Sequence, residues 1–199
     1  MFDVHSPKES VISVPCLYHT HPGKGDTQKT LEIVAQRAKE LDIKNVLVAS
    51  TSGETGLLAA RMIKTAQVIV VTHSTGFLEP DRQQLRPELK KLIEAEGAQV
   101  LTCQHALGGV GRAVRKKLGT YELEEIIAYT LRIFGEGTKV AIEIALMAAD
   151  AGHVSTREPC LSIGGTGEGA DTAILLRPAH AQNFFDLKIG EILAKPRLI

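Results

Sequence analysis

The chain contains short, unbroken apolar runs that alternate with stretches of helical character. Residues 46–49 and 68–72 are the clearest of these runs, and both are rich in valine. A strand that is apolar on both sides is typical of a parallel sheet with helices on its two faces, because neither side meets water. The alternation of strands and helices predicts an α/β fold with a mostly parallel central sheet and right-handed crossovers.

The remaining elements complete a three-layer arrangement, a central sheet flanked by helices, in a single domain of residues 1–199. Further strands are predicted at 11–18, 99–103, 160–163, 172–176 and 184–194. Helices are predicted at 27–41, 53–65, 87–97, 122–134 and 136–151, with a short one ending near Gly119. Pro15 predicts an edge or a bend in the first strand, and the alternating tail predicts a last edge strand.

The charge balance argues against several classes of partner. Lys and Arg number 23, as do Asp and Glu, so the formal net charge is zero. A general electrostatic grip on nucleic acid or on an anionic membrane is therefore not expected. No run reaches the roughly 18 apolar residues that span a bilayer. Residues 1–6 lack the basic and apolar segments of a signal peptide, which favours a cytoplasmic location.

The cysteine pattern favours free thiols rather than disulfides or zinc ligands. Cys16, Cys103 and Cys160 are odd in number, and each lies in or beside an apolar run. Buried thiols in a reducing compartment are the expected state, and no pair has the CxxC spacing of a zinc site. His19 and His21 lack a neighbouring carboxylate motif, so no metal is expected.

The segment Ser-Thr-Ser-Gly-Glu-Thr-Gly at 50–56 directly follows a predicted strand and opens a predicted helix. Its hydroxyls can donate hydrogen bonds, Gly53 allows close approach of the backbone, and a helix N-terminus offers free N–H groups and partial positive charge. This pattern is typical of an anion site. The alternative is that Ser52 or Thr51 simply caps the helix.

Five polar or glycine-rich segments follow predicted strands, at 19–23, 50–55, 73–76, 105–112 and 164–171. The carboxyl ends of parallel strands meet at one edge of a sheet, where ligands bind near a switch in strand order. We therefore expect these segments to share one rim. This convergence favours the ligand interpretation of the 50–56 segment over simple capping.

Four pieces of sequence together resemble a small family of stand-alone proteins related to the C-terminal α/β domain of pyruvate kinase. They lie at 48–55, 105–112, 142–152 and 164–173, and the likeness runs from about residue 19 to 196. The resemblance implies the fold of that domain and, in the stand-alone members, FMN bound at the rim. The catalytic barrel of pyruvate kinase is absent, so no kinase activity and no catalytic residue can be assigned.

The resemblance also implies roles for individual residues. A phosphate would be held by Ser50, Thr51, Ser52, Gly53 and Thr55. A glycine-rich cover would be formed by Gly165, Thr166, Gly167 and Gly169. Close approach to the flavin ring or ribityl chain would be allowed by Gly108, Gly109 and Gly111. Glu54 departs from the basic residue often found there, and we expect it to face solvent because its charge would repel phosphate.

Several polar residues of the rim have two interpretations each. His73 and His105 could bond a ligand or act as acid or base, or could bond backbone at the sheet end. Arg112 could pair with phosphate or with the flavin oxygens, or form a surface ion pair. Asp171 could bond ribityl hydroxyls or organise its turn. The run at 164–167 leads into a strand rather than a helix, so it is not a dinucleotide fingerprint.

Three functional hypotheses follow. The first is a cytoplasmic FMN-binding protein with a flavin-dependent redox role, and the second a non-catalytic sensor of a phosphorylated metabolite. The third is a scaffold whose rim is vestigial. Association into a homo-oligomer stays open through the apolar helix at 136–151 or the tail. Glu143 within that helix is expected to be satisfied by Lys139 or by solvent.

Overall fold

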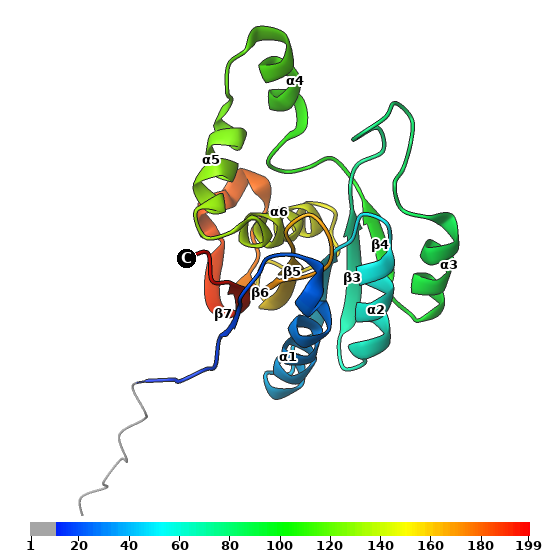
Figure 1. The fold of residues 1–199 in the computed structure, drawn as a ribbon, viewed down its shortest axis with the longest axis vertical. Coiled ribbons are helices and arrows are strands. Elements are labelled where there is room, and N and C mark those ends of the chain that lie inside the picture. Colours follow the sequence, from blue (N-terminus) through cyan, green and yellow to red (C-terminus); the bar gives the residue numbers. More distant parts are fainter. Residues whose placement is uncertain (1–10) are drawn as a thin grey trace, which may run out of the picture.

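A computed structural model describes residues 11–199 of the chain; residues 1–10, which include the segment tested for a signal peptide, lie outside that range. The described residues form one seven-stranded sheet with the order β1-β7-β6-β5-β2-β3-β4 (Figure 1). The strands are β1 (Leu17–His19), β2 (Asn45–Ala49), β3 (Gln67–Thr72), β4 (Gln99–Thr102), β5 (Cys160–Gly164), β6 (Thr172–Arg177) and β7 (Lys188–Pro196).

The sheet is mostly parallel, as predicted. Strand β2 pairs parallel with both β3 and β5, β3 pairs parallel with β4, and β1 pairs parallel with β7. Strand β6 pairs antiparallel with both of its neighbours, so it alone of these strands runs the other way. The carboxyl ends of six strands and the start of β6 therefore lie along the same edge.

Helices cover both faces of this sheet, which confirms the three-layer prediction. On one face lie α1 (Thr27–Glu40), α2 (Glu54–Met62) and α3 (Pro87–Ala95), and on the other α5 (Leu123–Arg132) and α6 (Glu136–Asp150). Helix α4 (Gly109–Leu118) projects beyond the sheet edge with α5 beside it (Figure 1). No helix within residues 11–199 is long and apolar enough to cross a membrane.

The unbroken apolar runs have the physical cause that the sequence predicts. Along β2, Val46 and Val48 pack into the core beneath α1 and α2, whereas Leu47 packs into the core beneath α6. Successive side chains of a strand point to opposite faces, so a strand covered on both sides must be apolar throughout. Ile69 on β3 is likewise buried on the α6 side.

Helix α6 is central, as its lack of charge predicts, and most of its residues are buried. It lies directly against the end of β5, where a Cβ at Gly164 would lie 2.2 Å from the carbonyl oxygen of Gly137. Because α6 is already covered by the sheet and by α5, it does not offer the association surface that its apolar sequence suggests.

The tail was predicted as an edge strand, and this prediction is wrong. Strand β7 lies between β1 and β6, and β1 is the edge. Strand β1 pairs only with residues 194–196 of β7, so residues 188–193 have no strand partner on that side among the described residues. Strand β1 is much shorter than the predicted 11–18, but its edge position agrees with the proline that precedes it.

Candidate ligand-binding rim

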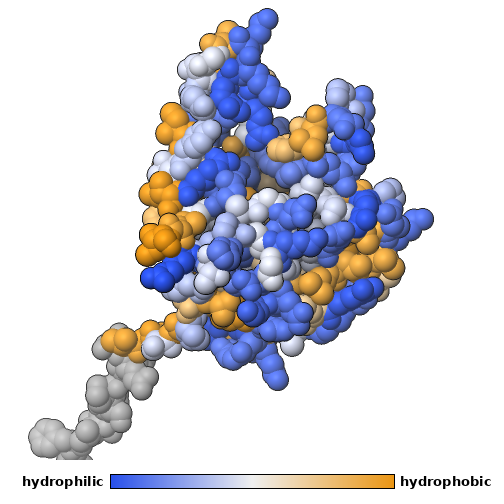
Figure 2. Space-filling view, viewed as in Figure 1, coloured by the Kyte–Doolittle hydropathy of each residue, from blue (hydrophilic) through white to orange (hydrophobic). Residues whose placement is uncertain are grey.

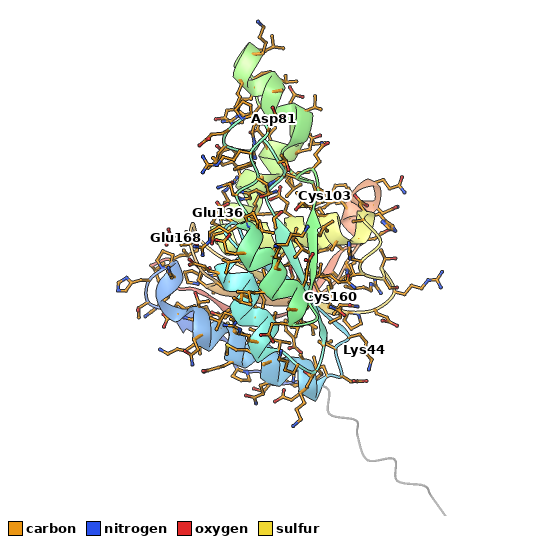
Figure 3. All side chains as sticks on the ribbon, turned by 90° about the vertical axis from the view of Figure 1, so that its right-hand side faces the viewer. Lys44, Asp81, Cys103, Glu136, Cys160 and Glu168 are labelled. Carbon is orange, nitrogen blue, oxygen red and sulfur yellow. The ribbon has the colours of Figure 1, made fainter. Side chains whose placement is uncertain are left out.

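The five segments that the sequence places at one rim do lie along one edge of the sheet. They follow β1, β2, β3, β4 and β5, which run in the same direction. In Figure 3, Lys44 and Cys160 mark the amino ends of β2 and β5, and Cys103 and Glu168 mark the opposite edge. From β2 the chain adds β3 and then β4 on one side of β2, and it then returns to form β5 on the other side of β2. The strand order therefore reverses between β2 and β5, and in such folds ligands bind at this switch point.

The loop after β2, residues 50–55, caps α2 and leaves N–H groups unused. The hydroxyl oxygen of Ser50 accepts a hydrogen bond from the Gly56 N–H at 3.1 Å, and that of Ser52 lies 3.5 Å from the Glu54 N–H. The capping alternative is therefore realised mainly by Ser50, rather than by the Thr51 or Ser52 expected. Within residues 11–199, four main-chain N–H groups here donate no hydrogen bond, those of Thr51, Ser52, Gly53 and Thr55.

The same loop is held rigidly by the long connection between β3 and α3. Gly53 has a φ of 104°, and a Cβ there would lie 2.7 Å from Leu85 and 2.9 Å from Leu89. The Arg86 N–H donates a hydrogen bond to the Ser52 carbonyl at 3.1 Å. Only glycine combines this left-handed backbone with so close a neighbour, so Gly53 is required by the packing of the loop itself.

Two cations flank the mouth of the 50–55 loop, and Glu54 bridges them. One carboxylate oxygen of Glu54 lies 2.7 Å from the Arg86 guanidinium and the other 3.6 Å from the Lys24 ammonium. The Glu54 side chain is 54% exposed, which confirms that it faces solvent. Lys24 also lies 4.0 Å from Glu168 on the glycine-rich loop. The sequence analysis gives Lys24 and Arg86 no role, although Arg86 directly precedes α3 and Lys24 begins the 3-10 helix Lys24–Asp26 that leads into α1.

Asp171 anchors the glycine-rich loop at 164–171. Its side chain is fully buried, and one carboxylate oxygen accepts hydrogen bonds from the N–H groups of Gly23 at 2.8 Å and Thr166 at 3.1 Å. The other oxygen accepts the Thr172 hydroxyl at 2.7 Å. The turn-organising role is the one that these contacts display, and it ties the glycine-rich loop to the β1–α1 connection.

The glycines of this loop are explained largely by close packing. Gly169 has a φ of 73°, and a Cβ there would lie 2.4 Å from the Thr27 hydroxyl and 2.6 Å from the Lys24 Cα. A Cβ at Gly165 would lie 2.2 Å from the Gly169 carbonyl oxygen. Gly167 and Glu168 form the exposed crest of the loop, and Glu168 lies beside Lys24 at the 50–55 mouth.

A second cluster of rim residues lies beyond β3 and β4. The rings of Phe77 and His105 stack with centroids 4.8 Å apart, and the Arg112 guanidinium lies 4.8 Å from the Phe77 centroid. His73 packs against Phe77 at 4.2 Å. The hollow between the β3–α3 loop and α4 (Figure 2) contains a pocket of about 230 Å³, lined by Ser74, Gly76, Phe77, Gln104, His105, Gly109, Arg112, Ala113 and Lys116.

The two histidines of this cluster make different contacts. Burial lowers the pKa of His73 and so favours its neutral form, and its Nδ1 lies 2.8 Å from the Gln84 side-chain oxygen. His105 Nε2 lies 3.4 Å from the Ser74 N–H, and its Nδ1 lies 3.7 Å from Glu143. The His105 ring therefore makes the backbone hydrogen bond expected at the sheet end, whereas the His73 ring bonds the side chain of Gln84.

A buried ion pair lies beneath the pocket. The Lys139 ammonium lies 2.5 Å from one oxygen of Glu143, and the Leu107 N–H donates to the other at 3.0 Å. Burial alone would raise the pKa of Glu143, but the nearby His105 ring and the Lys139 charge outweigh it and lower that pKa to about 2. The expectation that Lys139 satisfies Glu143 is confirmed.

The three glycines at the start of α4 lie close to neighbouring side chains. A Cβ at Gly109 would lie 2.1 Å from the Gln104 amide, and one at Gly108 would lie 2.9 Å from the Arg112 guanidinium. At Gly111 the nearest atom is 3.1 Å away, on Glu122. Of the three, only Gly109 lines the pocket.

The described residues hold no cluster suited to a metal ion. No group of three or more His, Cys, Asp and Glu side chains comes together within residues 11–199. His19 is buried and engaged, with its ring nitrogens 3.0 Å from the Thr30 hydroxyl and 3.2 Å from Asp26. The three cysteines are free thiols.

The family model described as "Pyruvate kinase, alpha/beta domain" matches residues 28–176. The chain belongs to this family. A pyruvate kinase structure from Cryptosporidium parvum is 12% identical over 77% of this chain and 23% of that one, with a TM-score of 0.42. A structure of Cryptosporidium parvum pyruvate kinase in complex with ADP is 13% identical over 89% of this chain and 24% of that one, with a TM-score of 0.38. A variant of O-ureido-L-serine synthase with O-ureido-L-serine bound is 18% identical over 66% of this chain and 49% of that one, with a TM-score of 0.30.

The chain thus spans about a quarter of the pyruvate kinases that it matches. Membership in the pyruvate kinase alpha/beta domain family agrees with the observed three-layer fold.

Proposed function

We propose that the rim binds a phosphorylated small molecule through the 50–55 loop, and that FMN is this ligand. The observation that carries the proposal is the set of unused main-chain N–H groups at the switch point, at residues 51, 52, 53 and 55. They stand at the N-terminus of α2, where the helix dipole favours an anion. Lys24 and Arg86 add positive charge on both sides of this mouth.

The residues present fit the two ends of FMN. The phosphate would lie on the N–H groups of the 50–55 loop and on the Thr55 hydroxyl, and Thr166 and Gly167 would cover it. The planar ring would lie against Phe77 and Arg112. Neighbouring strands are about 5 Å apart, so the ends of β2 and β4 are separated by roughly 10 Å, a gap for the ribityl chain.

The pocket by itself is smaller than a complete nucleotide site. Its volume is about 230 Å³, whereas small-molecule sites typically measure about 300–1,000 Å³. It would therefore hold the ring alone, with the phosphate outside it on the 50–55 loop. Bound FMN supplies redox chemistry, and this chain would bind and orient it and set the polarity around the ring.

Glu54 would act as a stand-in for the phosphate. In the absence of ligand its carboxylate neutralises Arg86 and Lys24, and a bound phosphate would replace it as their partner. Because the Glu54 side chain is 54% exposed, it can swing away into solvent at small cost.

A second candidate function, a non-catalytic sensor of a phosphorylated metabolite, is favoured by the charges of the pocket. Arg112 and Lys116 line it, and neither forms an ion pair within the described residues. These cations could hold a second anionic group in place of a flavin ring. A thermal-shift screen separates the two functions: stabilisation by sugar phosphates but not by FMN would favour the sensor.

The decisive variant is Thr55→Asp, with Thr55→Asn as its matched control. An acidic residue in the first turn of α2 favours the helix, but its charge would repel a phosphate at the mouth. We expect Thr55→Asp to weaken FMN binding about 100-fold, since a close like-charge contact costs several kcal/mol, and the Asn variant to stay within about fivefold. FMN binding measured by fluorescence that is equal in both variants, or absent from the unmodified protein, would overturn the proposal.

A further inference from the structure

Helix α5 carries apolar residues on two opposite sides. Its inner side, with Ile127, Ala128 and Leu131, packs against α6 and the β4–α4 connection. On the outer side, Ile126 and Ile133 are 53% and 71% exposed. The inner residues are accounted for by the core, whereas the outer ones contact nothing that would bury them.

The outer residues form one continuous surface. Ile126, Tyr129 and Ile133 follow the spacing i, i+3, i+7, which places them in a single stripe along the helix. Tyr121 joins this stripe, because its ring meets that of Tyr129 edge-on with centroids 5.6 Å apart. With Leu123, 68% exposed, these residues are called the α5 face below. Figure 2 shows hydrophobic residues along the side of the molecule that carries α5.

Together with its flanking residues, the α5 face approaches the size of one side of a protein interface. Its five residues are each at least half exposed and together present on the order of 600 Å², taking about 200 Å² or more for a large side chain. Leu118 and Phe134, 71% and 53% exposed, flank it and enlarge it further. A stable interface buries about 800 Å² on each partner, whereas the largest apolar patch of a typical monomer measures about 300–600 Å².

Two arginines at the α5 face have carboxylate partners. Arg115 lies 2.9 Å from Glu125 and 5.4 Å from the Tyr121 centroid. Arg132 pairs with Glu136 and lies 5.1 Å from the Tyr129 centroid. An apolar centre with Tyr and Arg side chains resembles the energetic centre of known interfaces. Because both arginines already have a carboxylate partner, they do not repel a copy of the same face.

We propose that the α5 face binds the same face of a second copy of this chain. The two α5 helices would run antiparallel about a twofold axis near Tyr129, so that Ile126 of one copy packs against Ile133 of the other. Such an isologous contact is the commonest closed symmetry among oligomers. The zero formal charge of the chain adds no long-range repulsion between copies.

The test compares two variants that place the same charge on exposed helix positions. Ile126→Glu alters the α5 face, and Leu92→Glu alters a leucine on α3 that is 43% exposed and lies outside it. Sedimentation over a wide concentration range should show a dimer for the unmodified protein and for Leu92→Glu. Ile126→Glu should raise the dimer dissociation constant about 30-fold or more, as expected for a central interface residue.

Circular dichroism should be the same for the three proteins, because both positions are exposed. A second readout is direct: under mild oxidation, Tyr129→Cys should form a disulfide-linked dimer and Leu92→Cys should not, since only position 129 meets its own copy. A monomeric unmodified protein, including one that instead binds lipid vesicles through this surface, would overturn the proposal. So would equal dissociation constants for Ile126→Glu and the unmodified protein.

Discussion

The two halves of the rim consist of different chemical groups. At the ends of β2 and β5, the candidate site consists of main-chain N–H groups, glycines and exposed ion pairs through Glu54. At the ends of β3 and β4, it consists of stacked rings above the buried Lys139–Glu143 pair. The first half should be sensitive to backbone conformation, and the second to the identity of single side chains.

The largest expected effect is on the second half. Lys139→Met removes the partner of a carboxylate that is only 4% exposed, and an unpaired buried charge costs about 3–5 kcal/mol of folding free energy. Urea denaturation should report this loss. The double variant Lys139→Met/Glu143→Leu should regain most of it, because no charge is then left without a partner. Equal stability of the single variant and the unmodified protein would show that the pair is not buried in solution.

The same pair predicts a dependence of stability on pH. Glu143 has a pKa of about 2 in the folded protein, below its ordinary value of 4.5. A lowered pKa stabilises the fold above the unfolded value, and this contribution is lost as the pH falls through 4.5 toward 2. We expect a loss of about 3 kcal/mol across that window. The double variant should lack this component, and a parallel pH profile for both proteins would contradict the assignment.

A somewhat smaller effect is expected from the backbone of the first half. Gly53→Ala combines a φ of 104° with a Cβ only 2.7 Å from Leu85, which should cost about 2–4 kcal/mol. Gly97→Ala is the matched control, because its φ is 85° and a Cβ there meets open space. The control should lose about 1–2 kcal/mol, from backbone strain alone. If thermal or urea unfolding gives equal losses, the loop is not held by the β3–α3 connection.

The smallest expected effect concerns the exposed ion pairs. Glu54→Gln releases Arg86 and Lys24 from their carboxylate and should strengthen FMN binding about two- to fivefold at low salt. Added salt should erase most of the difference, since these charges are exposed. Calorimetric titration at two salt concentrations is the measurement. Weaker binding by Glu54→Gln would mean that the carboxylate contacts the ligand instead of competing with it.

The sequence predicted the framework of the molecule better than the details of its rim. The apolar runs at β2 and β3 and the proline that begins α3 are local signals, and the structure confirms the elements that they mark. The position of β7 inside the sheet depends on pairing with β1, nearly the whole chain away. An alternating pattern records which residues are exposed but not which strand lies beside them, so the tail was placed at the edge.

At the rim, too, the local sequence does not show which distant segments come into contact. The polar segments were found because they follow strands, and the parallel sheet brings them together. The sequence does not show which of their side chains meet: Phe77 contacts Arg112 of helix α4, and Arg86 contacts Glu54, 32 positions away. Glycines that resemble ligand contacts in sequence, such as Gly165, have close protein neighbours in the structure.

The most direct test of the central claim is a titration followed by the backbone amide signals of residues 51–55 in nitrogen-15 NMR spectra. The account predicts that FMN shifts the amide signals of Thr51, Ser52, Gly53 and Thr55, and that riboflavin, which has the ring but no phosphate, leaves them nearly unchanged. Amide signals that stay in place with FMN and with sugar phosphates alike would contradict the claim that this loop receives a phosphate.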